Sequence, residues 1–86
     1  MIISLPSVRP DLEILGQRLR AIREARGLPL VSLARQCEIT SADLSLAEHG
    51  RLRLTSAQFH ALIDVLHVSP RILFEPGIDV SNLRRL

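Results

Sequence analysis

Residues 30–50, with the sequence LVSLARQCEITSADLSLAEHG, constrain the fold of this chain more than any other segment. Small or apolar residues recur there at the spacing of one helical stripe: Leu30, Leu33, Ala34 and Cys37. Thr40 can then cap a second helix, and its neighbour Ser41 begins that helix. The segment predicts two short helices joined by a tight turn. This is a helix-turn-helix pattern, in which the second helix can enter the major groove of DNA.

Apolar periodicity and helix breakers extend this pair into a larger helical unit. We expect helices from Pro10 to about Arg26, from Pro29 to Cys37, over 41–48, from Thr55 to Leu66 and from Ser69 to Phe74. Five short helices with tight connections leave no room for a sheet, so the expected fold is all-α, a compact five-helix bundle. Residues 1–9 would form an N-terminal arm, 10–76 the helix-turn-helix domain and 77–86 a C-terminal tail.

Composition narrows the classes of function. The 86 residues are enough for one domain, and the 47% hydrophobic content is enough for a folded core. The net charge of +2 permits nucleic-acid binding without demanding it. We expect a cytoplasmic chain, since it shows no secretory signal and no apolar run of about 18 residues. It shows no nucleophile–base pair, metal-ligand cluster or phosphate loop. We therefore expect no enzyme, no cofactor, no metal and no small-molecule ligand.

Several segments resemble one family when their order and spacing are taken together. They are LGQRLRAIREARGL, SLARQ, AEHG and LIDVLHVSPRILF. Over about residues 12–75 the chain resembles the lambda-repressor-like, Cro/C1 (XRE) family of helix-turn-helix DNA-binding domains. The resemblance implies a five-helix fold and a homodimer bound to double-stranded DNA at a pseudo-palindromic operator. The expected function is sequence-specific transcriptional regulation, with repression as its form.

One ion pair is expected inside the domain. Arg23 lies about 40° around its helix from Leu19, beside the apolar stripe. A partly buried guanidinium requires a carboxylate partner, and Glu48 at the end of the third helix is the best candidate. Members of the family commonly join an arginine and a glutamate at the matching positions. We therefore expect this pair to fix the third helix against the first.

The resemblance also assigns a base-facing surface, formed by Leu30, Thr40, Ser41, Ala42 and Leu46. The family often places Gln, Arg, Lys or Asn at several of these positions, whereas this chain has hydroxyls, a methyl group and two leucines. Hydroxyls discriminate weakly between bases, and aliphatic side chains can touch the thymine methyl group. We therefore expect limited direct readout, with DNA shape contributing more.

Phosphate contacts need donors near helix ends and loops, which favours Arg35, Ser45, Arg51 and Arg53. Arg18 and Arg20 on the first helix are expected to be solvated or to add phosphate contacts. Arg84 and Arg85 are expected to be solvated charges of the tail or, as the alternative, an end of the chain that touches DNA. His49 is expected to be solvated or to lie near the DNA backbone.

Two backbone positions depart from the family pattern. Glu38 and His67 stand where the family usually has glycine. A left-handed conformation there would cost on the order of 1 kcal/mol each.

An alternative function remains open at this stage. Leu30 and Leu46 would be apolar residues on a surface meant for DNA. They equally suit a protein-interaction module, such as an antitoxin or an adaptor, built on the same scaffold with little DNA binding.

Overall fold

The helices begin and end close to the positions that caps and breakers predict. The computed structural model describes residues 10–74, which contain five α-helices and no strand. The helices are α1 (Pro10–Ala25), α2 (Leu30–Gln36), α3 (Ser41–Glu48), α4 (Ser56–Leu66) and α5 (Pro70–Phe74). The predicted all-α five-helix fold is therefore confirmed. The predicted arm and tail, with Arg84 and Arg85, lie outside the described residues.

The ends of α1, α2 and α3 share one backbone motif. In each, a residue with positive φ follows the helix, and two backbone N–H groups bond back to carbonyls of the last turn. The longer-range bond joins Leu28 to Arg23, Ile39 to Ala34 and Arg51 to Leu46, at N–O distances of 3.1, 2.9 and 2.8 Å. These bonds satisfy helix-end carbonyls and keep the connections short.

Glu38 and His67 adopt the left-handed conformation considered for them, with φ of 57° and 56°. Helix α4 begins with a capping box. Thr55 Oγ1 accepts from the backbone of Gln58, and Gln58 Oε1 accepts from the backbone of Thr55.

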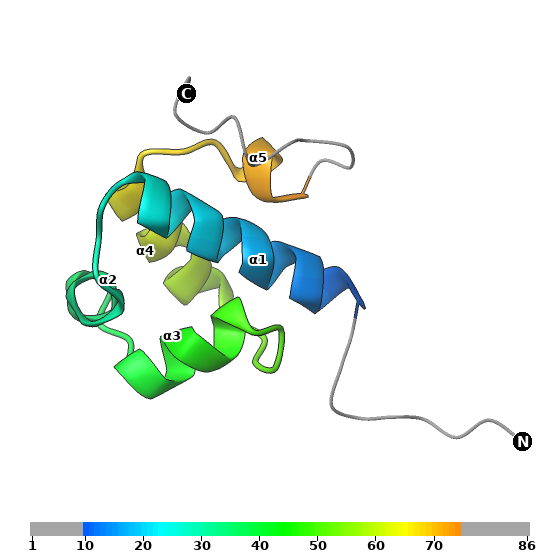
Figure 1. Ribbon diagram of the computed structural model, residues 1–86, viewed down its shortest axis with the longest axis horizontal. Coiled ribbons are helices and arrows are strands. Elements are labelled where there is room, and N and C mark those ends of the chain that lie inside the picture. The colour runs from blue at the N-terminus through cyan, green and yellow to red at the C-terminus, as the bar shows by residue number, and fades with distance from the viewer. Residues whose placement is uncertain (1–9, 75–86) are drawn as a thin grey trace, which may run out of the picture.

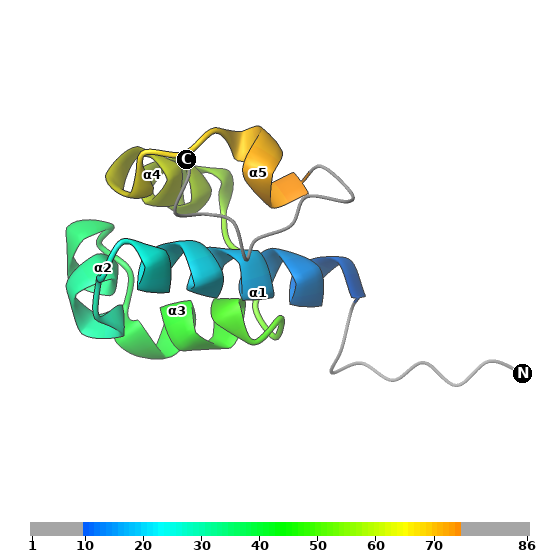
Figure 2. The same cartoon turned by 45° about the horizontal axis from the view of Figure 1, so that its top comes forward.

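Helix α1 lies through the middle of the molecule. Figure 2 shows α3 on one side of it and α4 and α5 on the other, and Figure 1 shows α2 at the C-terminal end of α1. Aliphatic side chains fill the space between these helices; the largest fully buried ones are Leu19, Ile22, Leu33, Leu44, Leu62, Leu66 and Leu73. Full burial of one such side chain contributes about 1.5–3 kcal/mol. The core thus holds α3 on a frame that includes all the other helices.

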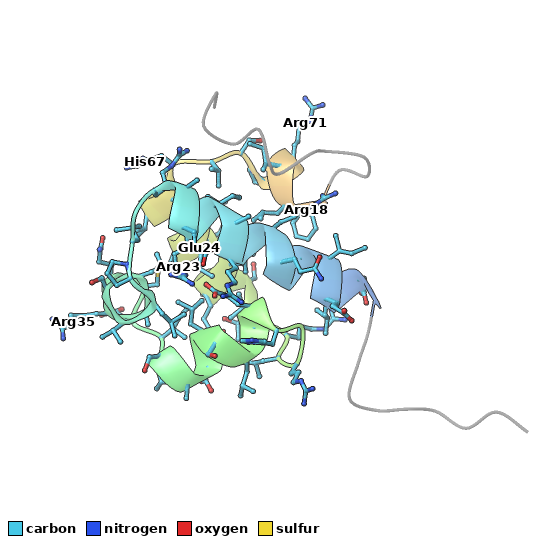
Figure 3. The ribbon with its side chains drawn as sticks, in the orientation of Figure 1. Arg18, Arg23, Glu24, Arg35, His67 and Arg71 are labelled. Atoms are coloured by element: carbon cyan, nitrogen blue, oxygen red, sulfur yellow. The ribbon has the colours of Figure 1, made fainter. Side chains whose placement is uncertain are left out.

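Arg18 corrects one expectation from the sequence. It is buried rather than solvated or available to phosphate, and its Nη1 donates to the carbonyl oxygens of Ile72 and Leu73 at 3.4 and 3.0 Å. Figure 3 shows its side chain between α1 and α5. Because these carbonyls belong to the last residues of a short helix, Arg18 both caps α5 and attaches it to α1.

Cys37 is buried beside the turn between α2 and α3, as its place in the apolar stripe predicts. Burial raises the pKa of its thiol, because the charged thiolate is poorly solvated there. In the part of the chain that the structure describes, no helix is long and apolar enough to cross a membrane.

Candidate nucleic-acid interface

The turn between α2 and α3 sets the direction of α3. Cys37 ends α2, Glu38 reverses the chain with its positive φ, and Ile39 is buried in the core. The side chain of Thr40 then caps α3, because its Oγ1 accepts the backbone N–H of Asp43 at 3.0 Å. The start of α3 is therefore fixed on one side by an apolar anchor and on the other by a hydroxyl cap.

The inner face of α3 packs closely against α1. Leu44 and Ala47 are buried there, and a Cβ atom added to Gly16 of α1 would collide with the carbonyl oxygens of Ala47 and Glu48. The absence of a side chain at position 16 therefore lets the two helix backbones approach. The other face of α3 is left for solvent or a ligand.

The structure joins Arg23 and Glu48 in a nearly buried ion pair. Arg23 Nε donates to Glu48 Oε2 at 2.7 Å, and Nη2 donates to Oε1 at 3.1 Å, which makes the contact bidentate. Nη1 of the same arginine donates to the carbonyl oxygen of Leu28 at 2.9 Å, in the loop before α2. The hydrogen bond to Glu48 raises the pKa of Arg23, so its guanidinium stays charged. One arginine thus connects α1, the α1–α2 loop and α3 (Figure 3).

Four of the five residues assigned to the base-facing surface are exposed: Thr40, Ser41, Ala42 and Leu46. Leu30 differs, because it is half-buried and packs against the core. The next residue, Val31, is 56% exposed and was not singled out from the sequence. The sequence pattern placed Leu30 on the apolar stripe of α2 but gave no signal for Val31, since exposure of an aliphatic residue depends on what neighbouring helices cover.

The residues expected to contact phosphate are arranged around α3. Arg35 lies near the end of α2 and extends away from the molecule in Figure 3, and Arg51 and Arg53 follow the end of α3. All three are exposed, and none of their side chains makes a hydrogen bond or ion pair within residues 10–74. Ser45 is half-buried on α3.

The other arginines of the same range are engaged elsewhere. Arg20 contacts Glu24, Arg26 donates to the carbonyl oxygen of Leu66, and Arg71 has an electrostatic or hydrogen-bonding partner of its own. Within the described residues, the arginines left without a protein partner are therefore the three next to α2 and α3. No group of three or more His, Cys, Asp or Glu residues in this range is placed to hold a metal ion.

Comparison with known proteins agrees with this arrangement. Residues 14–73 match the family model described as a helix-turn-helix domain. The restriction-modification controller protein C.AhdI from Aeromonas hydrophila is 32% identical over 77% of this chain and all of that chain, with a TM-score of 0.73. The clp gene regulator ClgR from Corynebacterium glutamicum is 28% identical over 77% of this chain and 86% of that chain, with a TM-score of 0.71.

A third solved structure resembles the fold alone. It is a mutant of the restriction-modification controller protein C.Esp1396I, which is 22% identical over 79% of this chain and 86% of that chain, with a TM-score of 0.70. No curated protein sequence matches the chain significantly. The family resemblance predicted from the sequence is confirmed by the family model and the solved structures.

Proposed function

The chain belongs to the helix-turn-helix domain family, and from this premise we propose that it is a sequence-specific DNA-binding transcriptional regulator. In this proposal α3 enters the major groove with Ser41, Ala42 and Leu46 toward the bases. Repression is the simplest consequence of a regulator that occupies its operator. C.AhdI and ClgR carry the names of a controller and a gene regulator, which supports the same class of function.

One observation carries this proposal. The exposed face of α3 is flanked by Arg35, Arg51 and Arg53, which are the described arginines without a protein partner. Phosphate oxygens lie on both sides of a major groove, and guanidinium groups bind them through two parallel hydrogen bonds. An α-helix with arginine side chains that have no protein partner near its two ends can bind duplex DNA. The guanidinium groups can bind the phosphates of the two strands while the helix faces the bases.

Changing Arg51 and Arg53 together to alanine is expected to weaken binding to all duplexes by about tenfold or more, because phosphate contacts carry no sequence information. The slope of log K against log salt concentration should become less negative by about 1.8 per bound chain, since each neutralised phosphate contributes about 0.9 to that slope. Fluorescence anisotropy at several salt concentrations measures both quantities. The duplex should first be selected from a random library.

Arg71→Ala is the control for loss of charge, because Arg71 lies on α5, on the far side of α1 from α3 (Figures 1 and 3). It should change the salt slope little. A salt slope that Arg51→Ala/Arg53→Ala leaves unaltered would remove these two residues from the interface. Failure of the unaltered chain to select any duplex would contradict the regulator proposal and favour a protein-interaction module.

A homodimer would place two α3 helices on successive turns of one DNA face, about 34 Å apart, and so match a pseudo-palindromic operator. The surface that supports this part of the proposal is at α5. Phe74 is 60% exposed, its ring lies 5.1 Å from that of Phe59, and it borders a largely apolar groove of about 220 Å³ that Leu12 and Leu15 also line. An exposed aromatic beside such a groove favours contact with a second chain.

Phe74→Arg is expected to weaken self-association at least about tenfold, because a charged side chain is costly in an apolar contact. Sedimentation equilibrium over a range of concentrations measures the change. Ile14→Arg, at another exposed apolar residue, is the control. A wild-type chain that sediments as a monomer would contradict the homodimer, and a Phe74→Arg dimer of unchanged strength would contradict an interface at α5.

A further inference from the structure

The exposed face of α3 can be defined residue by residue. At 100° per residue, Ala42, Ser45, Leu46 and His49 fall within an arc of about 100°. Ala42, Leu46 and His49 are exposed and Ser45 is half-buried, whereas the opposite side of the helix is buried. These four residues, called the outer face of α3 below, continue from the exposed Ser41 along the side of the helix that a major groove would meet.

The outer face lacks the side chains that read bases most strongly. Bidentate recognition of guanine or adenine uses Arg, Lys, Asn or Gln, and none of these stands on it. His49 offers one ring nitrogen, since its Nδ1 lies 2.7 Å from the carbonyl oxygen of Ser45. With Ser41 at the start of the helix, the available polar groups are therefore two serine hydroxyls and a single imidazole nitrogen, and none of them can make the bidentate contact that discriminates strongly between bases.

The apolar part of the outer face is better developed. Leu46 is 42% exposed and does not belong to the residues packed around the core. Ala42 stands one helical turn before it, so the two side chains form a continuous aliphatic strip along the helix. In the major groove, the one apolar group that distinguishes one base from another is the C5 methyl group of thymine. The strip therefore has one chemical counterpart on DNA.

We propose that Ala42 and Leu46 determine sequence specificity by binding thymine methyl groups in the major groove of the operator. This inference rests on the proposed function. It names what α3 recognises, namely T·A pairs at the bases opposite Ala42 and Leu46, through apolar contact rather than a pattern of hydrogen bonds. The half-sites should accordingly be rich in thymine at these positions.

The test replaces single thymines by deoxyuridine in a duplex selected by the full-length chain. Deoxyuridine keeps the hydrogen-bonding edge of thymine and lacks only the methyl group. Burial of one such carbon changes a binding constant about fourfold, so each contacted thymine should show about a fourfold loss of affinity. Replacement in both half-sites should give about a fifteenfold loss. Thymines outside the region protected from hydroxyl radicals are the DNA control and should show none.

Protein variants then assign the effect to Leu46. At one of the sensitive positions, the Leu46→Ala variant should bind thymine and deoxyuridine equally well, without the fourfold preference of the unaltered chain. Its fold should persist because the Leu46 side chain lies outside the core. Ile14→Ala removes an exposed aliphatic side chain from α1 and should keep the full preference.

The outcomes separate this inference from the proposed function. Equal affinity for thymine and deoxyuridine at every position, with specific binding intact, would overturn the inference and leave the regulator in place. A thymine preference that Leu46→Ala leaves unaltered at every position would overturn the assignment of Leu46. Selection of no duplex at all would instead contradict the proposed function, and the inference would fall with it.

Discussion

Glu48→Ala is expected to lower the free energy of unfolding by about 3–5 kcal/mol, the usual cost of breaking a buried ion pair by removing one partner. The side chains of Arg23 and Glu48 are only 12% and 3% exposed, and two hydrogen bonds join them. Without the carboxylate, the guanidinium would keep its bond to the carbonyl oxygen of Leu28 but lose its counter-charge in a nearly dry site. Urea denaturation followed by circular dichroism measures the loss.

A second Arg–Glu pair on α1 supplies the matched control. Arg20 and Glu24 are 53% and 57% exposed, with Nε and Oε2 3.4 Å apart. Glu24→Ala should therefore cost less than about 1 kcal/mol. Replacing both partners of the buried pair, as Arg23→Met with Glu48→Leu, should restore much of the lost stability, since no unpaired charge remains. Equal losses for Glu24→Ala and Glu48→Ala would contradict a special role for the buried pair.

The elements of this fold could be predicted because their signals are local. Thr40, Thr55 and Gly27 mark helix ends through the hydrogen bonds of their own few neighbours, and the structure has each of these ends. The turn between α2 and α3 could be predicted in the same way, because Ile39 is apolar and the chain buries this residue just before α3 begins. The packing of the helices against one another therefore left these predicted helix ends nearly unchanged.

The arginines show which contacts cannot be predicted from the sequence. The helical angle that places Arg23 beside Leu19 also places Arg18 about 40° from Ile22, so its burial could have been inferred. Its acceptors could not, because they are backbone carbonyls of α5, and every residue carries a carbonyl. Glu48 was recognisable as a partner because its side chain is itself charged. A partner is predictable from sequence when its chemistry belongs to the side chain.

The same limit holds at the candidate interface. The family pattern identified Ala42 and Leu46 on α3, where helical geometry fixes the outward direction. It did not separate Leu30 from Val31, because near the start of a short helix the covering neighbour decides which residue is exposed. Only the packed arrangement of α2 against the core placed Leu30 inside and Val31 outside.

Gly50→Ala is expected to lower the free energy of unfolding by about 2–5 kcal/mol, through backbone strain and overpacking together. The residue has φ of 74°, a conformation that costs an alanine about 1–2 kcal/mol. An added Cβ would also lie 2.6 Å from the Cα atom of Glu13 and 2.9 Å from its backbone nitrogen. Because these are backbone atoms of α1, the helices must move apart, which adds about 1–3 kcal/mol of overpacking.

Gly27→Ala isolates the contribution of backbone strain. Gly27 has nearly the same φ, 68°, but nothing lies within 4 Å of its added Cβ, so this variant should cost only the conformational part, about 1–2 kcal/mol. The two variants should also differ in DNA affinity when both are fully folded, since Gly50 follows α3 directly and only its replacement pushes the end of that helix off α1. Denaturation curves and anisotropy titrations measure both differences. Equal destabilisation by the two substitutions would mean that backbone conformation alone matters at Gly50, and that the close approach of α1 does not hold α3 in place.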